Sequence, residues 1–91
     1  MKYLKVHWHH SSADTPVLLY SELDAERWEV HKVEVYRDGR HEFACDSVTT
    51  GSTRLGEVPV PPLEEIASDP EFSPTEISKE EFEKVWDRLE L

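Results

Sequence analysis

The chain has 91 residues, of which 37% are hydrophobic, and its 20 acidic and 10 basic side chains give a formal net charge of −10 at pH 7. This length leaves room for one domain, residues 1–91, around one hydrophobic core. The negative charge argues against nucleic acids and anionic membranes as partners, since both attract cationic surfaces.

The chain begins with two predicted strands. Residues 2–9 alternate between apolar and polar side chains, and a period of two is typical of a half-buried strand. One face of this strand carries Leu4, Val6 and Trp8, and the other carries Lys5, His7 and His9. After a polar loop, residues 17–23 form a mostly apolar run that is short enough for a strand buried on both faces.

A β-hairpin is predicted where residues 28–36 and 40–48 flank Asp38-Gly39. A two-residue turn would place Phe43 opposite Glu34. A type I turn followed by a glycine in the left-handed conformation gives a three-residue loop instead. The pairs are then Val33 with Phe43, Val35 with His41, and His31 with Cys45. We favour this second register, because it pairs apolar residues with apolar residues.

The favoured register implies an irregularity in the first strand of the hairpin. Trp28 and Val30 then point away from Val33 and Val35, which breaks the alternation expected of a regular strand. We therefore expect either a bulge near His31 or a strand that is covered on both faces.

The last third of the chain predicts two helices. Residues 57–62 carry three prolines and are expected to be extended. Residues 63–67 then follow at helical spacing, and Asp69-Pro70 ends this short helix. In the second helix Ser78 is a good N-cap, and Glu81 completes a capping box. The buried face of this helix is expected to carry Phe82, Val85, Trp86 and Leu89.

Together these elements predict an α+β fold: an antiparallel sheet of four to five strands with a short helix and a C-terminal amphipathic helix packed on one face. Cys45 is the only cysteine, so no intramolecular disulfide can form, which suits a reducing cytosol. The N-terminal residues lack the pattern of a signal or transit peptide, and no stretch approaches the roughly 20 apolar residues that span a bilayer. We therefore expect a cytoplasmic protein.

The acidic excess lies in the second part of the chain. Residues 1–56 hold 9 acidic and 7 basic side chains, whereas residues 57–91 hold 11 acidic and 3 basic ones. On the final helix, carboxylates spaced at i, i+3, i+7 and i+10 fall along one side. These residues, which we call the acidic ridge, are Glu80, Glu83, Asp87 and Glu90. Lys84 and Arg88 lie on a neighbouring side of the helix and screen only part of this charge.

Two interpretations fit the acidic ridge. The first is a solvated helix face that keeps a small protein soluble. The second is a docking surface for a basic protein. Like charges four residues apart, such as Glu83 and Asp87, destabilise a helix by about 0.2–0.5 kcal/mol. We favour the docking surface, because a helix optimised for stability alone would alternate its charges at these positions.

Histidine and cysteine side chains supply the candidates for metal binding and catalysis. His7 and His9 point the same way on a strand, an arrangement found in some zinc sites. Further ligands would have to come from elsewhere in the chain, among His31, His41, Cys45 and Asp14. Cys45 opposite His31 lacks a third group that would orient a nucleophilic pair, because the adjacent Asp46 points to the other face. We expect no catalytic residues, no metal and no cofactor, and we expect Cys45 to pack as a small hydrophobe.

Three stretches of the sequence together resemble a known family. They are Tyr3–Val6 with Pro16–Leu23, then Arg27–Gly39, then Thr53–Pro61 continuing to Ile66, Asp69–Phe72 and Ile77–Phe82. The family consists of small bacterial proteins, common in actinobacteria, and is known as a domain of unknown function. The sequence departs from the family at residues 9–12, where the family more often has acidic residues, and this weakens a metal site built on those histidines.

The resemblance implies no reaction and no catalytic residues. By association, small acidic bacterial proteins of this kind often serve as immunity proteins for polymorphic toxins, an analogy and not a mechanism. We therefore expect a binding protein, an immunity-type inhibitor that occludes a basic toxin domain with its acidic ridge. One alternative is a small metal-binding or enzymatic module that uses His7, His9 and Cys45. Another is a regulatory or assembly domain that pairs through an exposed sheet edge.

Overall fold

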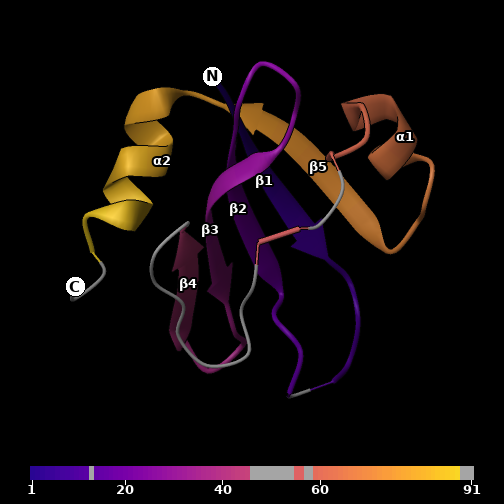
Figure 1. Ribbon diagram of the computed structural model, residues 1–91. Coiled ribbons are helices and arrows are strands. Elements are labelled where there is room, and N and C mark those ends of the chain that lie inside the picture. The colour runs from indigo at the N-terminus through magenta and orange to yellow at the C-terminus, as the bar shows by residue number, and fades with distance from the viewer. Residues whose placement is uncertain (13, 46–54, 57–58, 89–91) are drawn as a thin grey trace.

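Backbone hydrogen bonds join five antiparallel strands into one sheet in the part of the chain that the computed structural model describes, residues 1–12, 14–45, 55–56 and 59–88 (Figure 1). Two helices accompany the sheet in this part of the chain. In chain order the elements are β1 (Lys2–Trp8), β2 (Leu18–Leu23), β3 (Glu29–Val35), β4 (His41–Cys45), α1 (Leu63–Ala67), β5 (Phe72–Ile77) and α2 (Lys79–Trp86). The predicted α+β fold is therefore confirmed.

The strand order is β4-β3-β2-β1-β5. The first four strands form a meander, and the connection that carries α1 then crosses to the far edge, where β5 pairs with β1. β5 is a strand that the sequence did not predict, because it contains Pro74. Pro74 pairs with Val6 from an edge strand, the position in a sheet where a missing backbone N–H is tolerated. The extended, proline-rich segment does not join the sheet in its described part, residues 59–62.

The hairpin formed by β3 and β4 has the favoured register. Val33 pairs with Phe43, and the other predicted pairs, Val35 with His41 and His31 with Cys45, are also present. Gly39 adopts a φ of +92°, and its N–H donates to the carbonyl oxygen of Tyr36 at 2.9 Å. A left-handed glycine thus sets the three-residue loop and with it the register.

The irregularity expected near His31 is a β-bulge. His31 pairs with Glu22 of β2, whereas the next residue of β2, Leu23, pairs with Glu29. Val30 is therefore the extra residue on β3. Because of this extra residue, His31 and Val33 point to one face of the sheet, and Glu29 points to the other.

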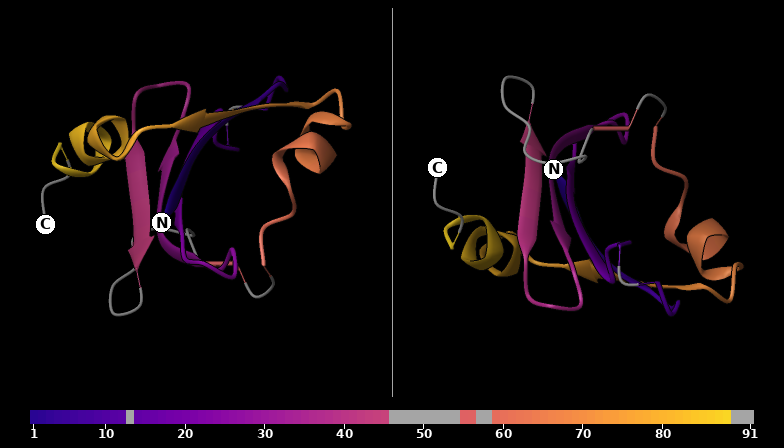
Figure 2. Two further views of the ribbon diagram at one scale, coloured as in Figure 1. Left: turned by 90° about the horizontal axis from the view of Figure 1, so that it is seen from above. Right: turned by 90° about the horizontal axis from the view of Figure 1, so that it is seen from below.

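The two helices lie on opposite faces of the sheet (Figure 2), whereas the sequence-based expectation placed both on one face. The strands carry apolar side chains on both faces, and each face requires its own cover. Tyr3 and Val33 are buried on the side of α2, and Leu4 and Val6 are buried on the side of α1. α2 follows β5 after the single residue Ser78, so it starts at the sheet edge and packs on the nearer face.

Helix α2 begins as the sequence predicts. The Ser78 hydroxyl oxygen accepts a hydrogen bond from the backbone N–H of Glu81 at 3.1 Å, which satisfies one of the free donors of the first turn. Phe82 is buried, and its ring packs against Tyr3 at a centroid distance of 5.5 Å. Leu89, which was also predicted for the buried face, lies outside the described residues. No helix in the described ranges is long and apolar enough to cross a membrane.

Candidate protein-binding site

The acidic ridge lies on the outer side of α2. Glu80, Glu83 and Asp87 are exposed, and their spacing places them away from the buried Phe82. Glu90, the fourth predicted member, lies outside the described residues. The predicted exposure of the ridge therefore holds for the three members that the structure describes.

Basic side chains neutralise the ridge only in part. Lys79 and Glu83 form an ion pair at 3.8 Å, with side chains 64% and 53% exposed. An exposed pair of this kind contributes less than about 1 kcal/mol and is screened by salt. Lys84 and Arg88 are exposed as well, so acidic and basic side chains lie side by side on the surface of α2.

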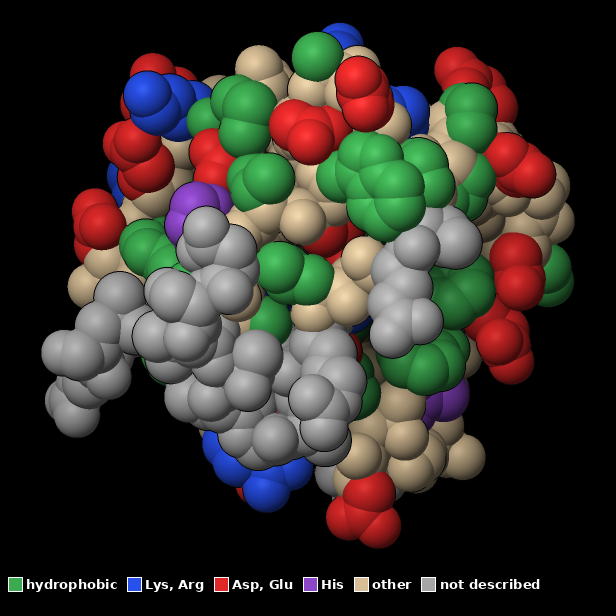
Figure 3. All heavy atoms as spheres, viewed as in Figure 1, with side chains coloured by type: hydrophobic (Ala, Val, Ile, Leu, Met, Phe, Trp, Pro, Cys, Tyr) green, Lys and Arg blue, Asp and Glu red, His purple; other side chains and the backbone are tan. Residues whose placement is uncertain are grey.

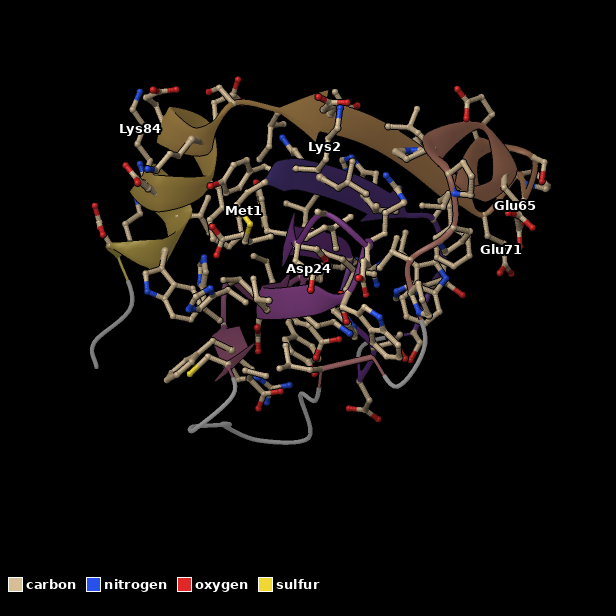
Figure 4. The ribbon with its side chains drawn as sticks, turned by 45° about the horizontal axis from the view of Figure 1, so that its top comes forward. Met1, Lys2, Asp24, Glu65, Glu71 and Lys84 are labelled. Atoms are coloured by element: carbon tan, nitrogen blue, oxygen red, sulfur yellow. The ribbon has the colours of Figure 1, made fainter. Side chains whose placement is uncertain are left out.

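A second acidic surface surrounds α1 and was not predicted from the sequence. Its exposed carboxylates are those of Glu64, Glu65, Asp69 and Glu71. On the face shown in Figure 3, acidic side chains gather along the edge beside α1, whereas acidic and basic side chains mix over α2. In Figure 4, Glu65 and Glu71 project from the α1 end and Lys84 from the α2 end. The signal in the sequence is that no lysine or arginine stands between Arg54 and Lys79.

An apolar cavity of about 340 Å³ lies between α1 and the sheet. Its walls include Leu4, Val6, Leu19, Val60, Ile66 and Phe72. Three of the polar residues that also line it, Ser21, Glu29 and Lys32, are bonded to one another through the Glu29 carboxylate. Glu29, whose side chain is 8% exposed, accepts hydrogen bonds from the Ser21 hydroxyl at 2.8 Å and the Gly56 N–H at 2.7 Å. These bonds tie the connecting segment to the sheet, so this carboxylate has a structural role.

A smaller cavity of about 150 Å³ lies on the other face, between α2 and the sheet. We call it the α2 pocket, and it is lined by Tyr3, Glu22, His31, Phe82, Glu83 and Trp86. Pairing of β1 with β2 and of β2 with β3 places Glu22 beside both Tyr3 and His31. The Glu22 carboxylate accepts hydrogen bonds from the His31 Nδ1–H and from the Tyr3 hydroxyl.

Aromatic contacts hold the walls of the α2 pocket. The Trp86 ring meets the His31 ring edge to face, with centroids 4.7 Å apart, and stacks near Phe82 with centroids 6.2 Å apart. Phe43 of β4 meets the Trp86 ring edge to face, with ring centroids 5.6 Å apart. Such pairs stabilise beyond the area they bury, by about 0.5–1.5 kcal/mol each. The indole is thus fixed by rings from two strands and from its own helix.

The α2 pocket has a negative electrostatic environment. The pKa of Tyr3 is raised above its usual value, first because the phenol is buried and next because its hydroxyl donates to the Glu22 carboxylate. The negative charges of Glu22, Glu83 and Glu80 raise this pKa further. Glu83 and Glu80, two members of the acidic ridge, thus lie close enough to Tyr3 to contribute to its raised pKa.

The histidines of the alternative metal site do not converge with Cys45. His7 and His9 stack on each other with centroids 5.3 Å apart, and the His9 Nε2 forms a hydrogen bond with the Ser73 hydroxyl. Cys45 lies on β4, three strand spacings or about 14 Å from β1. Within the described ranges, no group of three histidine, cysteine or acidic side chains could hold a metal ion.

The described residues define a small α+β protein with acidic side chains exposed around both helices. The chain belongs to the family described as Domain of unknown function (DUF6881), whose sequence model matches residues 2–90. This match confirms the resemblance to a family without an assigned function. Neither the curated proteins nor the solved structures include one that matches the chain.

Proposed function

We propose that this protein is an acidic protein-binding module, an immunity-type inhibitor that occludes a basic bacterial toxin domain. The observation that carries the proposal is the exposed row of Glu80, Glu83 and Asp87 on a helix whose opposite side is anchored by the buried Phe82. Glu90 extends this row in the sequence. A rigid, anchored helix presents its carboxylates in a fixed pattern, which lowers the entropic cost of binding.

Such an inhibitor needs no chemistry of its own. A surface with net charge −10 attracts a cationic protein over a distance, which raises the association rate and makes it dependent on salt. Inhibition follows when the bound module covers a basic active site that would otherwise meet its substrate. The proposed contact is therefore a surface, and the residues that matter are those that contribute its charge.

The proposal is tested on the protein encoded directly upstream, because an immunity protein normally lies directly downstream of its toxin. The Glu83→Lys/Asp87→Lys variant reverses two ridge charges, and Glu64→Lys/Glu65→Lys makes the same change in net charge at α1. We expect only the α2 variant to weaken binding about tenfold or more, with a smaller effect at high salt because exposed charges are screened. Calorimetric titration measures both the loss of affinity and its dependence on salt. If the α2 variant binds as tightly as the wild type, the ridge is not the contact.

A further inference from the structure

We propose that the α2 pocket is a binding site for one cationic side chain, a lysine or an arginine, presented by a protein partner. That a protein partner supplies this cation rests on the function proposed above. The site itself rests on the geometry of the pocket. Three features of the pocket support this site: a cavity, aromatic walls and two carboxylates that differ in exposure.

The size of the cavity suits the end of a long side chain. Its volume of about 150 Å³ is several times the roughly 30 Å³ that a water molecule occupies in the liquid. The aliphatic stem of a lysine or arginine packs well on aromatic rings, and the charged head is attracted to the electron-rich faces of tyrosine and tryptophan. Tyr3, Phe82 and Trp86 supply such rings around this cavity.

The two carboxylates supply the charge that selects a cation. Glu22 is only 16% exposed, and its bonds to His31 and Tyr3 hold it in place. A carboxylate offers about four lone-pair positions, so Glu22 can accept a further hydrogen bond from an incoming donor. Glu83 at the mouth is engaged by Lys79 in an exposed ion pair at 3.8 Å, and a pair of this kind exchanges readily.

The surroundings disfavour other ligands. An anion would meet the carboxylates of Glu22 and Glu83, which both line the pocket and would repel it. A purely apolar group would bury the carboxylate of Glu22 without offering it a donor, which is costly. A cation with N–H donors satisfies both the charge and the hydrogen-bonding capacity.

The experiment titrates the whole 91-residue protein, without any partner, with n-butylammonium or n-butylguanidinium chloride. Amide and indole N–H resonances are followed by two-dimensional NMR. We expect saturable shifts at Tyr3, Phe82 and the Trp86 indole with both cations, with 1-pentanol and butyrate as the neutral and anionic controls. Equal shifts with 1-pentanol, or no shift at these residues with the cations, would overturn the site.

Two variants and a matched control locate the charge. Glu22→Gln keeps the shape of the pocket and removes its inner charge, and Glu83→Gln does the same at the exposed mouth without a change in the core. Glu64→Gln removes one charge at α1. We expect the first two variants to weaken cation binding about threefold to tenfold each and the control to leave it unchanged. Equal weakening in all three variants would mean general charge attraction and would overturn a specific site.

The cation titration and the partner-binding experiment test the pocket and the proposed function separately. If the cations do not bind but charge reversal at Glu83 and Asp87 still weakens the partner complex, the ridge is the contact and the pocket is not a subsite. If the cations bind but charge reversal at Glu83 and Asp87 has no effect on the partner complex, the pocket binds cations but the ridge is not the contact with the partner. The proposed function then fails.

Discussion

His31 of β3 and Trp86 of α2 meet edge to face, with ring centroids 4.7 Å apart and ring planes at 73°. The register of the β3–β4 hairpin places His31 on the face of α2, and the bulge at Val30 turns the preceding Glu29 to the face of α1. His31 also donates to Glu22, so one side chain links the carboxylate of the α2 pocket to the helix that carries the acidic ridge. The irregular strand and the anchored helix are parts of one arrangement.

Replacing Trp86 by alanine should destabilise the protein by about 2–3 kcal/mol. The change removes ring contacts with His31, Phe43 and Phe82, and the site is half-buried, so the cost falls below that of a fully buried tryptophan. Urea unfolding measures this difference. The matched control is Trp28→Ala, which removes an exposed indole and should cost about 1 kcal/mol or less. Equal losses would show that α2 is not anchored through Trp86.

Replacing Gly39 by alanine should cost about 1–2 kcal/mol through the backbone alone. The φ of +92° is a conformation that residues with a Cβ rarely adopt, and a Cβ built there meets no atom within 4 Å. Asparagine tolerates positive φ better, so Gly39→Asn should cost less than Gly39→Ala. Thermal unfolding of the two variants gives the comparison. An alanine variant as stable as the wild type would contradict a left-handed turn.

Where two neighbouring signals agree, the sequence predicts the structure well. The hairpin register follows from a glycine that must be left-handed and from the match of Val33 with Phe43, and both features lie within a few residues of the turn. The start of α2 follows from Ser78 in the same way. The exposure of Glu80 and Glu83 then follows from helical periodicity.

The elements that escaped prediction depend on contacts between distant parts of the chain. Pro74 reads locally as a strand breaker, and it is accommodated because pairing with Val6 puts it on the sheet edge. The α2 pocket likewise requires Tyr3, Glu22 and Trp86 to meet from two strands and a helix. The placement of the helices on opposite faces was missed because apolar residues on both sides of a strand do not show which helix covers which side.

Replacing Ser78 by alanine should destabilise the protein by about 1 kcal/mol. The variant loses the hydroxyl that accepts the N–H of Glu81, which leaves a donor of the first helical turn without this partner. Ser78→Asp keeps an acceptor at the same position and adds a favourable charge at the helix N-terminus, so it should retain the stability of the wild type. Chemical unfolding at neutral pH measures both variants. If alanine and aspartate behave alike, the cap does not stabilise α2.

Replacing Tyr3 by phenylalanine should change how stability depends on alkaline pH. The raised pKa means that the folded state holds the phenolic proton more tightly than the unfolded chain, whose tyrosine pKa is about 10. The stabilisation is therefore complete below about pH 10 and is lost as the pH rises from there through the folded-state pKa. Tyr3→Phe lacks this loss, and it should also be less stable at pH 8 by about 1 kcal/mol, because the hydrogen bond to Glu22 is gone.

The free-energy difference between wild type and Tyr3→Phe should therefore narrow as the pH rises from about 10 through the folded-state pKa of Tyr3. Urea unfolding across this range measures it, with Tyr20→Phe as a control that removes a half-buried tyrosine outside the α2 pocket. Glu83→Gln removes one of the charges that raise the Tyr3 pKa, so in that variant the alkaline loss of stability attributable to Tyr3 should be smaller. A difference that stays constant with pH would show that the pKa of Tyr3 is not raised in the folded state, and an alkaline loss that is unchanged in Glu83→Gln would show that the ridge does not act on the phenol.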